Sequence, residues 1–245
     1  MAGVHTTYRT TKGIGSNYVG MEGKLKLPSA YGARPNDANY KNGAFPEFMY
    51  GFYPTSISNK GCDCGIVCYP GGFKLFIADN GNGTFTESWK ESPNYLSIAK
   101  GADVTLRVIL TYRKLNIECL VDSVVKGTIF CSFVNDNIYN AFMNGCFVNT
   151  EMVIAINEDK DRNVNLVPAA YFKKGKFYNT NLINTAGKSV ALTTSNSTEK
   201  YWEDSGFPEF NNYADSRPTG IGVMASGFVS DEASATTDKT TAPIV

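Results

Sequence analysis

The three cysteines at positions 62, 64 and 68 are the most closely spaced reactive side chains in the sequence, in Gly-Cys-Asp-Cys-Gly-Ile-Val-Cys. Zinc prefers four ligands, and no histidine or fourth cysteine lies near them, so their spacing does not favour a zinc site. Oxidation offers another chemistry, in which Cys62, Cys64 and Cys68 cross-link neighbouring copies of the chain. Otherwise they belong to a reduced, partly buried loop. The other three cysteines are expected to be small buried hydrophobic residues: Cys119, Cys131 and Cys146.

Histidine is the usual side chain for proton transfer near neutral pH, and the chain has a single one, His5. It lies in a polar N-terminal stretch, which argues against Ser-His-Asp and Cys-His mechanisms. The sequence also lacks Gly-x-Ser-x-Gly, Gly-x-Gly-x-x-Gly and phosphate-binding Gly-rich motifs.

Oxygen-bearing side chains alternate at Asp159, Asp161 and Asn163, as calcium ligands do in a loop. The bend-permitting glycine and the closing glutamate of a calcium loop are missing, and Lys160 and Arg162 offset the charge. A solvated turn is therefore favoured, and the sequence predicts no cofactor, with calcium as the alternative.

A sugar site would combine an aromatic platform with amides and carboxylates, because aromatic rings of this kind present an apolar face and a polar edge. The residues that fit this description are Trp89, Tyr95, Tyr201, Trp202, Asn211, Asn212 and Asp215. Packing in the core is the competing interpretation for about half of the aromatic residues.

Strand patterns must position these residues. Val104–Tyr112, Leu115–Val121 and Val124–Phe133 alternate apolar and polar residues and are separated by short polar turns. They predict three consecutive antiparallel strands, whose apolar face needs a second layer to cover it.

The remaining pattern predicts further short strands and one short helix near Asp136–Asn144, with a tight turn at Asp79–Gly83. The further strands are expected at Tyr18–Leu27, Glu47–Tyr53, Gly65–Tyr69, Phe73–Ala78, Phe85–Lys90, Phe147–Ile156, Leu166–Phe172, Lys188–Thr193 and Ile221–Val229. Many short strands without alternating helices predict an all-β, two-sheet antiparallel β-sandwich. We expect an N-terminal arm (1–14), one sandwich domain (15–229) and an extended C-terminal tail (230–245).

The meander, together with Tyr18–Leu27 and Met152–Ile156, resembles the concanavalin A-like (laminin-G-like) jelly-roll sandwiches. The resemblance is one of pattern, spread over most of residues 15–230, without a diagnostic motif. It implies a jelly-roll fold and, by analogy, carbohydrate binding.

Carbohydrate-cleaving sandwiches of this kind use paired carboxylates arranged as Glu-x-Asp-x-x-Glu, and the chain has no such run. The nearest carboxylates are Glu151 at a strand start, and Glu158, Asp159 and Asp161 in the loop that follows. Glu47 and Glu209, in a repeated Phe-Pro-Glu-Phe, could also face each other across a cleft. Solvated carboxylates beside strand ends are the favoured interpretation. The sequence thus predicts no catalytic residues and a protein that is not an enzyme, with a glycoside hydrolase or lyase as the third alternative.

Composition decides between the remaining classes. The 23 basic and 23 acidic residues leave a net charge of zero, which argues against nucleic-acid binding and removes the repulsion that keeps copies apart. The 15 Phe and 14 Tyr suit contact surfaces, and an extended tail at 230–245 can add a strand to a neighbour's sheet. The leading hypothesis is a structural protein that assembles with other copies of itself into a filament or lattice, and the alternative is a glycan-binding, lectin-like module.

The N-terminus lacks the apolar segment of a secretory signal, and no run of 18 apolar residues occurs. We therefore expect synthesis in the cytoplasm and no membrane span, with a surface or extracellular location after release as the alternative.

Overall fold

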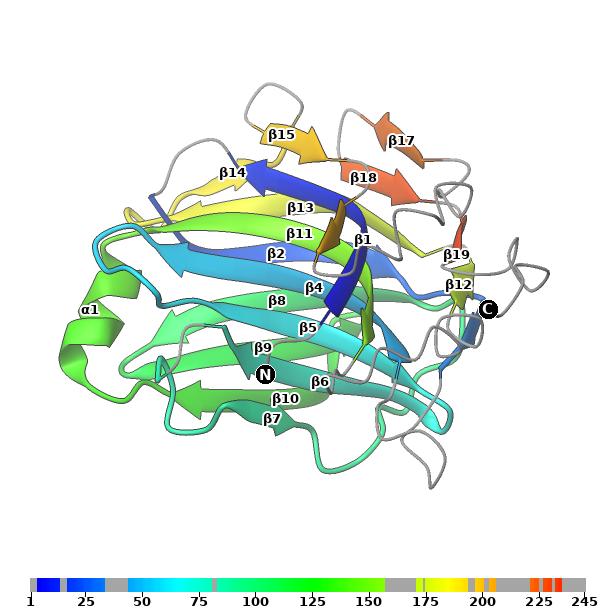
Figure 1. The fold of residues 1–245 in the computed structure, drawn as a ribbon, viewed down its shortest axis with the longest axis horizontal. Helices are drawn as coiled ribbons and strands as arrows, with labels where there is room; N and C mark the ends of the chain where they lie inside the picture. Colours follow the sequence, from blue (N-terminus) through cyan, green and yellow to red (C-terminus); the bar gives the residue numbers. More distant parts are fainter. Residues whose placement is uncertain are drawn as a thin grey trace.

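The structure is a computed structural model. It describes residues 4–13, 17–33, 44–80, 83–156, 171–173, 175–193, 197–200, 203–205, 221–224, 227–230 and 232–234. Nearly all of the regular structure in these ranges is antiparallel β-strand, and Figure 1 shows the strands stacked across the molecule.

The first layer contains the predicted meander. It runs in the order β10-β9-β8-β2-β13-β14, with consecutive strands hydrogen-bonded. Its strands are β2 (Tyr18–Lys26), β8 (Asp103–Thr111), β9 (Lys114–Val121), β10 (Val124–Ser132), β13 (Lys176–Asn184) and β14 (Ser189–Ala191). Apolar residues alternate with polar ones along β2, β8 and β9, so one face of this layer is buried and the other is polar.

The second layer runs in the order β7-β6-β5-β4-β11-β1. Its strands are β1 (Val4–Gly13), β4 (Ala44–Pro54), β5 (Cys62–Tyr69), β6 (Gly72–Asp79), β7 (Trp89–Glu91) and β11 (Cys146–Ile156). Two short strands, β15 (Ser197–Lys200) and β16 (Glu203–Ser205), pair with β1. The two layers are joined by one pair, Tyr18 of β2 with Cys146 of β11, and by an isolated bridge between Phe85 and Phe133.

Smaller elements complete the described part of the chain. The strands β3 (Ala30–Gly32), β12 (Tyr171–Lys173) and β19 (Glu232–Ser234) form one small sheet, and β17 (Ile221–Met224) and β18 (Gly227–Ser230) form another. The helix α1 (Asp136–Met143) begins at Asn135, whose side chain accepts a hydrogen bond from the backbone N–H of Ile138. Among the residues described, no helix is long and apolar enough to cross a membrane.

The main core lies between the layers. Phe48, Tyr50 and Phe52 of β4 point into it and are fully buried. The facing layer contributes a set of aliphatic side chains that alternate along its strands: Met21, Leu25, Val104, Leu106, Val108, Leu115 and Ile117. Burial of this apolar surface on both inner faces is what holds the two sheets together.

The predicted all-β, two-sheet antiparallel sandwich is confirmed, as is the helix near Asp136–Asn144. The predicted strand Phe85–Lys90 is wrong for its first half: only β7 at Trp89–Glu91 is a strand, because Phe85 bridges to the other layer instead. Ile221–Val229 forms two paired strands rather than one.

The sequence between β6 and β7 does not make the expected tight hairpin. The Asp79 carboxylate instead accepts hydrogen bonds from the backbone N–H groups of Gly83, Thr84 and Phe85, and so holds a longer connection. The predicted N-terminal arm contains β1, and the predicted tail contains β19. Most of the expected strand at Leu166–Phe172 lies outside the described residues.

Gly23 of β2 tests how tightly the layers pack. A Cβ atom at Gly23 would lie 2.6 Å from Thr180 Oγ1 and 2.8 Å from Tyr50 Oη, both of them buried. We therefore expect Gly23→Ala to lower the free energy of unfolding by about 1–3 kcal/mol, measured by urea denaturation. Adding Thr180→Ala removes the nearer contact and should recover part of that loss. Equal stability of Gly23→Ala and the wild type would show that Gly23 is not tightly packed against Thr180 of β13 and Tyr50 of β4.

Candidate functional site

The outer face of the second layer, turned away from the main core, gathers carboxyl groups from adjacent strands. Residues at alternate positions share a face, so Glu47 and Gly51 of β4 lie on the face opposite Phe48 and Tyr50. The strand register places Asn149 of β11 beside Gly51, and Asp63 of β5 on its other side. Met49 is flanked in the same way by Glu151 of β11 and Gly65 of β5. The resulting surface, across β11, β4, β5, β6 and β7, is called the acidic face below.

Glu47 is the buried carboxyl of this face, with 5% of its surface exposed. Its neighbours along and across the strands, Phe45, Met49 and Val67, belong to a second apolar cluster that is separate from the main core. Within the described part of the chain, no hydrogen bond or ion pair reaches its carboxyl group. Burial raises the pKa of Glu47 to about 8, and the negative charges of Asp63 and Glu91 add to this effect. Glu47 therefore carries a proton at neutral pH.

Asp63 differs from Glu47, although it is equally buried, with 6% of its surface exposed. Tyr53 Oη donates a hydrogen bond to Asp63 Oδ1 over 2.6 Å, and Asn80 Nδ2 donates to Asp63 Oδ2. Hydrogen bonds of this kind stabilise a carboxylate in its charged form. Burial, with the charge of Asp63, in turn raises the pKa of Tyr53 well above its ordinary value, so the phenol stays a donor.

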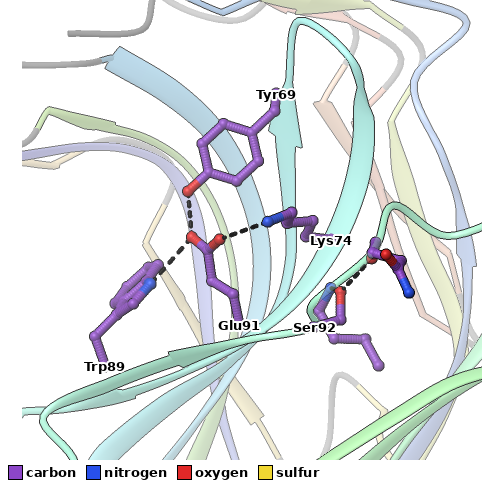
Figure 2. Close-up of polar contacts among 7 residues, drawn as sticks. Tyr69, Lys74, Trp89, Glu91 and Ser92 are labelled. Carbon is purple, nitrogen blue, oxygen red and sulfur yellow. Dashed lines mark hydrogen bonds and ion pairs between the residues drawn. The ribbon is translucent and has the colours of Figure 1, made fainter.

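Glu91 holds the edge of the acidic face on β7. Figure 2 shows its carboxylate accepting hydrogen bonds from Tyr69 Oη and from Trp89 Nε1 (3.0 Å), while Lys74 Nζ lies 3.3 Å from the other oxygen. Burial and the bond to Glu91 raise the pKa of Tyr69 well above its ordinary value. Next to this group, Ser92 Oγ donates to the backbone oxygen of Asn94 and accepts from the backbone N–H of Leu75, which fixes β7 against β6.

Glu151 is the carboxylate closest to Glu47 by register. Glu151 pairs with Met49 and Val153 pairs with Glu47, so the two glutamates occupy diagonal positions on neighbouring strands. Such positions lie about 7–8 Å apart. Glu151 is half-buried, and its Oε1 accepts a hydrogen bond of 2.7 Å from Asn149 Nδ2.

This arrangement gives the two glutamates different surroundings on one surface. Glu47 keeps its proton because it is buried among apolar groups, and Glu151 is held as an acceptor by an amide donor. Two carboxyl groups whose environments differ in this way can serve as acid and base in one reaction.

The sequence singled out Glu47 only in combination with Glu209, which lies outside the described residues. Asp63 and Glu91 were missed. The available signal is a single carboxylate inside an otherwise apolar strand, as Glu47 is in Phe-Pro-Glu-Phe-Met-Tyr and Asp63 is between two cysteines. His5 lies on β1 opposite Ala155.

The cysteines at positions 62, 64 and 68 form part of β5 rather than a loop. Their side chains are fully buried in the main core, and so are those of the other three cysteines. None of the six cysteines is joined in a disulfide. Burial raises the pKa of the Cys62 and Cys68 thiols well above the ordinary value. Cross-linking between copies through Cys62, Cys64 or Cys68 therefore requires β5 to leave the core, and it stays a prediction.

Of the predicted sugar contacts, the structure describes Trp89 and Tyr95. The Trp89 ring stacks on Phe76 at 5.0 Å, and half of the Tyr95 surface is exposed, with Lys74 Nζ 5.4 Å from its ring centre. The other predicted contacts lie outside the described residues: Tyr201, Trp202, Asn211, Asn212 and Asp215. The same holds for the predicted calcium ligands Asp159, Asp161 and Asn163. In the part of the chain that is described, no group of three or more His, Cys, Asp or Glu side chains is arranged to hold a metal ion.

Comparisons with known proteins bear on the fold. The sequence matches no family model and no curated protein. A scytalido-glutamic peptidase solved with a peptide-based transition-state analogue aligns over 94% of this chain and 100% of its own, with a TM-score of 0.55 and 15% identity. SCP-B, a peptidase of the eqolisin family solved with the tripeptide Ala-Ile-His, aligns over 94% of this chain and 99% of its own, with a TM-score of 0.53 and 16% identity. Congerin II aligns over 71% of this chain with a TM-score of 0.36 and 8% identity.

These comparisons correct one prediction. The chain was expected not to be an enzyme, but two solved structures that align over 94% of it are peptidases, at an identity that shows a shared fold. The expected absence of catalytic residues stays a prediction. The prediction failed because it relied on histidine and on glycosidase-type carboxylate motifs, and a sandwich can place single carboxylates from separate strands on one face. The hypothesis of self-assembly gains no support from the fold or from the comparisons.

The buried carboxyl of Glu47 makes stability depend on pH. Its pKa is raised from 4.5 to about 8 on folding, so the folded chain holds a proton that the unfolded chain releases between these values. The protonated Glu47 carboxyl therefore makes its full contribution to the free energy of unfolding below pH 4.5. That contribution, about 3–5 kcal/mol, is lost as the pH rises through 8.

We expect Glu47→Gln, which cannot ionise, to be about as stable as the wild type at pH 4.5 and clearly more stable at pH 8.5. Urea unfolding at both pH values measures this difference. Glu87→Gln is the matched control, because the Glu87 side chain is exposed and its replacement should not change the pH dependence. The same pH dependence in the wild type and in Glu47→Gln would contradict a protonated Glu47.

Proposed function

We propose that the protein is a hydrolase that cleaves peptide bonds with a pair of glutamates, Glu47 as the proton donor and Glu151 as the general base. The observation that carries the proposal is the protonated carboxyl of Glu47, which has no partner among the described residues and lies on the same sheet face as the hydrogen-bonded carboxyl group of Glu151. A group that keeps a proton at neutral pH is suited to give that proton to a substrate.

The proposed substrate class is taken from the proteins that share the fold. Both peptidase structures align along nearly their whole length, one of them is named a glutamic peptidase, and it was solved with a peptide-based analogue of the transition state. The identity of 15–16% supports the fold alone. The assignment of chemistry to this chain therefore rests on its own Glu47 and Glu151.

The proposed reaction is general acid–base hydrolysis. The Glu151 carboxylate removes a proton from a water molecule as the water oxygen forms a bond to the carbonyl carbon of the substrate. When the tetrahedral intermediate collapses, the carbon–nitrogen bond breaks and the Glu47 carboxyl gives its proton to the leaving amine. The products are a carboxylic acid and an amine, and a proton passes from Glu151 to Glu47 through solvent to restore the starting state.

The surrounding groups maintain this difference in protonation. Tyr53 and Asn80 donate hydrogen bonds to Asp63, Tyr69 and Trp89 donate to Glu91, and Lys74 pairs with Glu91. The negative charges of Asp63 and Glu91 add to burial in raising the pKa of Glu47.

Activity assays on variants test the proposal. We expect the wild type to cleave unstructured peptides, with kcat/KM falling as the pH rises through about 8, where Glu47 loses its proton. Glu47→Gln and Glu151→Gln should each lower kcat/KM by about 100-fold or more. Peptide cleavage is measured by release of new amino groups between pH 3 and pH 9, with Glu87→Gln as the control that keeps full activity.

The urea unfolding of Glu47→Gln described above shows whether a loss of activity comes from the lost carboxyl group or from unfolding. Since Glu47→Gln is expected to fold at least as well as the wild type, a loss of activity in this variant cannot be ascribed to unfolding. Full activity of a folded Glu47→Gln would refute the role of Glu47 as the acid.

Glycan binding is the second candidate, favoured by the half-exposed ring of Tyr95 beside Lys74, which itself pairs with Glu91. A glycan array probed with the wild type and with Tyr95→Ala tests glycan binding separately from peptide cleavage. Binding that disappears in Tyr95→Ala would support this role, and an empty array would remove it.

A further inference from the structure

Asn149 of β11 has an unusual hydrogen-bonding state. It is 5% exposed, and its Nδ2 donates to Glu151 Oε1 over 2.7 Å. Its Oδ1 is buried and accepts no hydrogen bond among the described residues. A buried polar atom without a partner costs about 1–3 kcal/mol, so native structures contain few of them and each needs a reason.

The backbone of β4 fixes the position of the Asn149 amide. Gly51 lies directly opposite Asn149 in the register of β4 and β11. A Cβ atom at Gly51 would lie 2.0 Å from Asn149 Oδ1 and 3.0 Å from its Cγ, so the amide rests on the backbone of β4 where a side chain would otherwise be. Gly51 has an ordinary strand conformation between Tyr50 and Phe52, so the conformational freedom of glycine is not needed at this position. A glycine is needed because the Asn149 amide occupies the space that a Cβ atom would fill.

The amide also links the two hydrogen-bonded parts of the acidic face. The Tyr53 ring lies over Gly51 as well, 2.7 Å from the position of the missing Cβ. Tyr53 donates to Asp63, which is held by Asn80. Asn149 therefore fits between the Glu151 carboxylate and the Tyr53 ring, and it has little freedom to rotate.

We propose that Asn149 is a positioning residue that orients the Glu151 carboxylate and keeps it ionised, and that Gly51 is the seat which holds the Asn149 amide in place. The proposal rests on the function proposed above, in which Glu151 is the base. The donor amide favours the charged form of Glu151 and fixes one of its oxygens, and the unpaired Oδ1 is the cost of keeping that amide turned toward Glu151. Small errors in the placement of a base lower the rate sharply.

The first test removes the amide. In Asn149→Ala, we expect kcat to fall by about one to two orders of magnitude with KM little changed, because Asn149 is buried and acts through Glu151. The acid limb of the pH–rate profile, where Glu151 takes up a proton, should move up by about one pH unit. A residue with only a structural role would lower stability without moving this limb.

The second test disturbs the seat. Gly51→Ala should produce the same kinetic defect and the same shift of the acid limb, because its Cβ displaces the Asn149 amide. Combined with Asn149→Ala, it should add much less than its effect in the wild type. The contact with Tyr53 is present in both backgrounds, so the difference between them isolates the coupling of Gly51 to Asn149. Fully additive effects would overturn the role of Gly51.

A measurement that does not depend on activity separates this inference from the proposed function. The carboxyl carbon of Glu151 can be titrated by NMR, with its signal assigned by comparison with Glu151→Gln. An upward shift of the titration midpoint in Asn149→Ala supports the positioning role even if the wild type cleaves no peptide, in which case the proposed function alone fails. An unchanged midpoint, or an unchanged acid limb in an active enzyme, would overturn the inference.

Discussion

Burial of the central strands β4 and β5 on both of their faces is the constraint on which the candidate site depends. Antiparallel sheets in two-layer proteins commonly bury one face and leave the other to water. Here, every residue from Cys62 to Cys68 is buried, and Phe45, Met49, Val67 and Phe76 form an apolar cluster on the outer side. A carboxyl group on that side has lost most of its hydration, and it must therefore be paired or protonated.

The acidic face shows both solutions next to each other. Tyr53 and Asn80 donate hydrogen bonds to Asp63, and Tyr69 and Trp89 donate hydrogen bonds to Glu91. These bonds replace part of the hydration that the two carboxyl groups have lost. Glu47 has no such donor among the described residues, and it responds by holding its proton. The same lack of water that raises the pKa of Glu47 strengthens the interactions of the neighbouring charges with it. The contrast between these residues is thus a result of donor placement, since all of them are carboxylic acids of similar intrinsic strength.

The sequence predicted the sandwich well because strand periodicity is a local property. The meander from Asp103 to Ser132 has a clear alternation and short turns, and it was found with boundaries within a residue or two. The site could not be found in the same way. Glu47, Asp63 and Glu151 are separated by up to about a hundred positions and meet only through the register of β11, β4 and β5, which a single sequence does not contain. The predicted strand Gly65–Tyr69 covers only the second part of β5, which begins at Cys62. A strand that is buried on both faces has no alternation from which its start can be detected.

All of the groups of the acidic face belong to one layer, and this has a mechanical consequence. Among the described residues, backbone hydrogen bonding joins the layers at the Tyr18–Cys146 pair and near the Phe85–Phe133 bridge, and apolar packing supplies most of the remaining contact between them. Sliding or breathing of one sheet against the other changes that packing, but it leaves the ladder of β11, β4, β5 and β6 intact. The spacing of the carboxyl groups is therefore set within one hydrogen-bonded sheet, and it does not depend on how the two layers pack against each other.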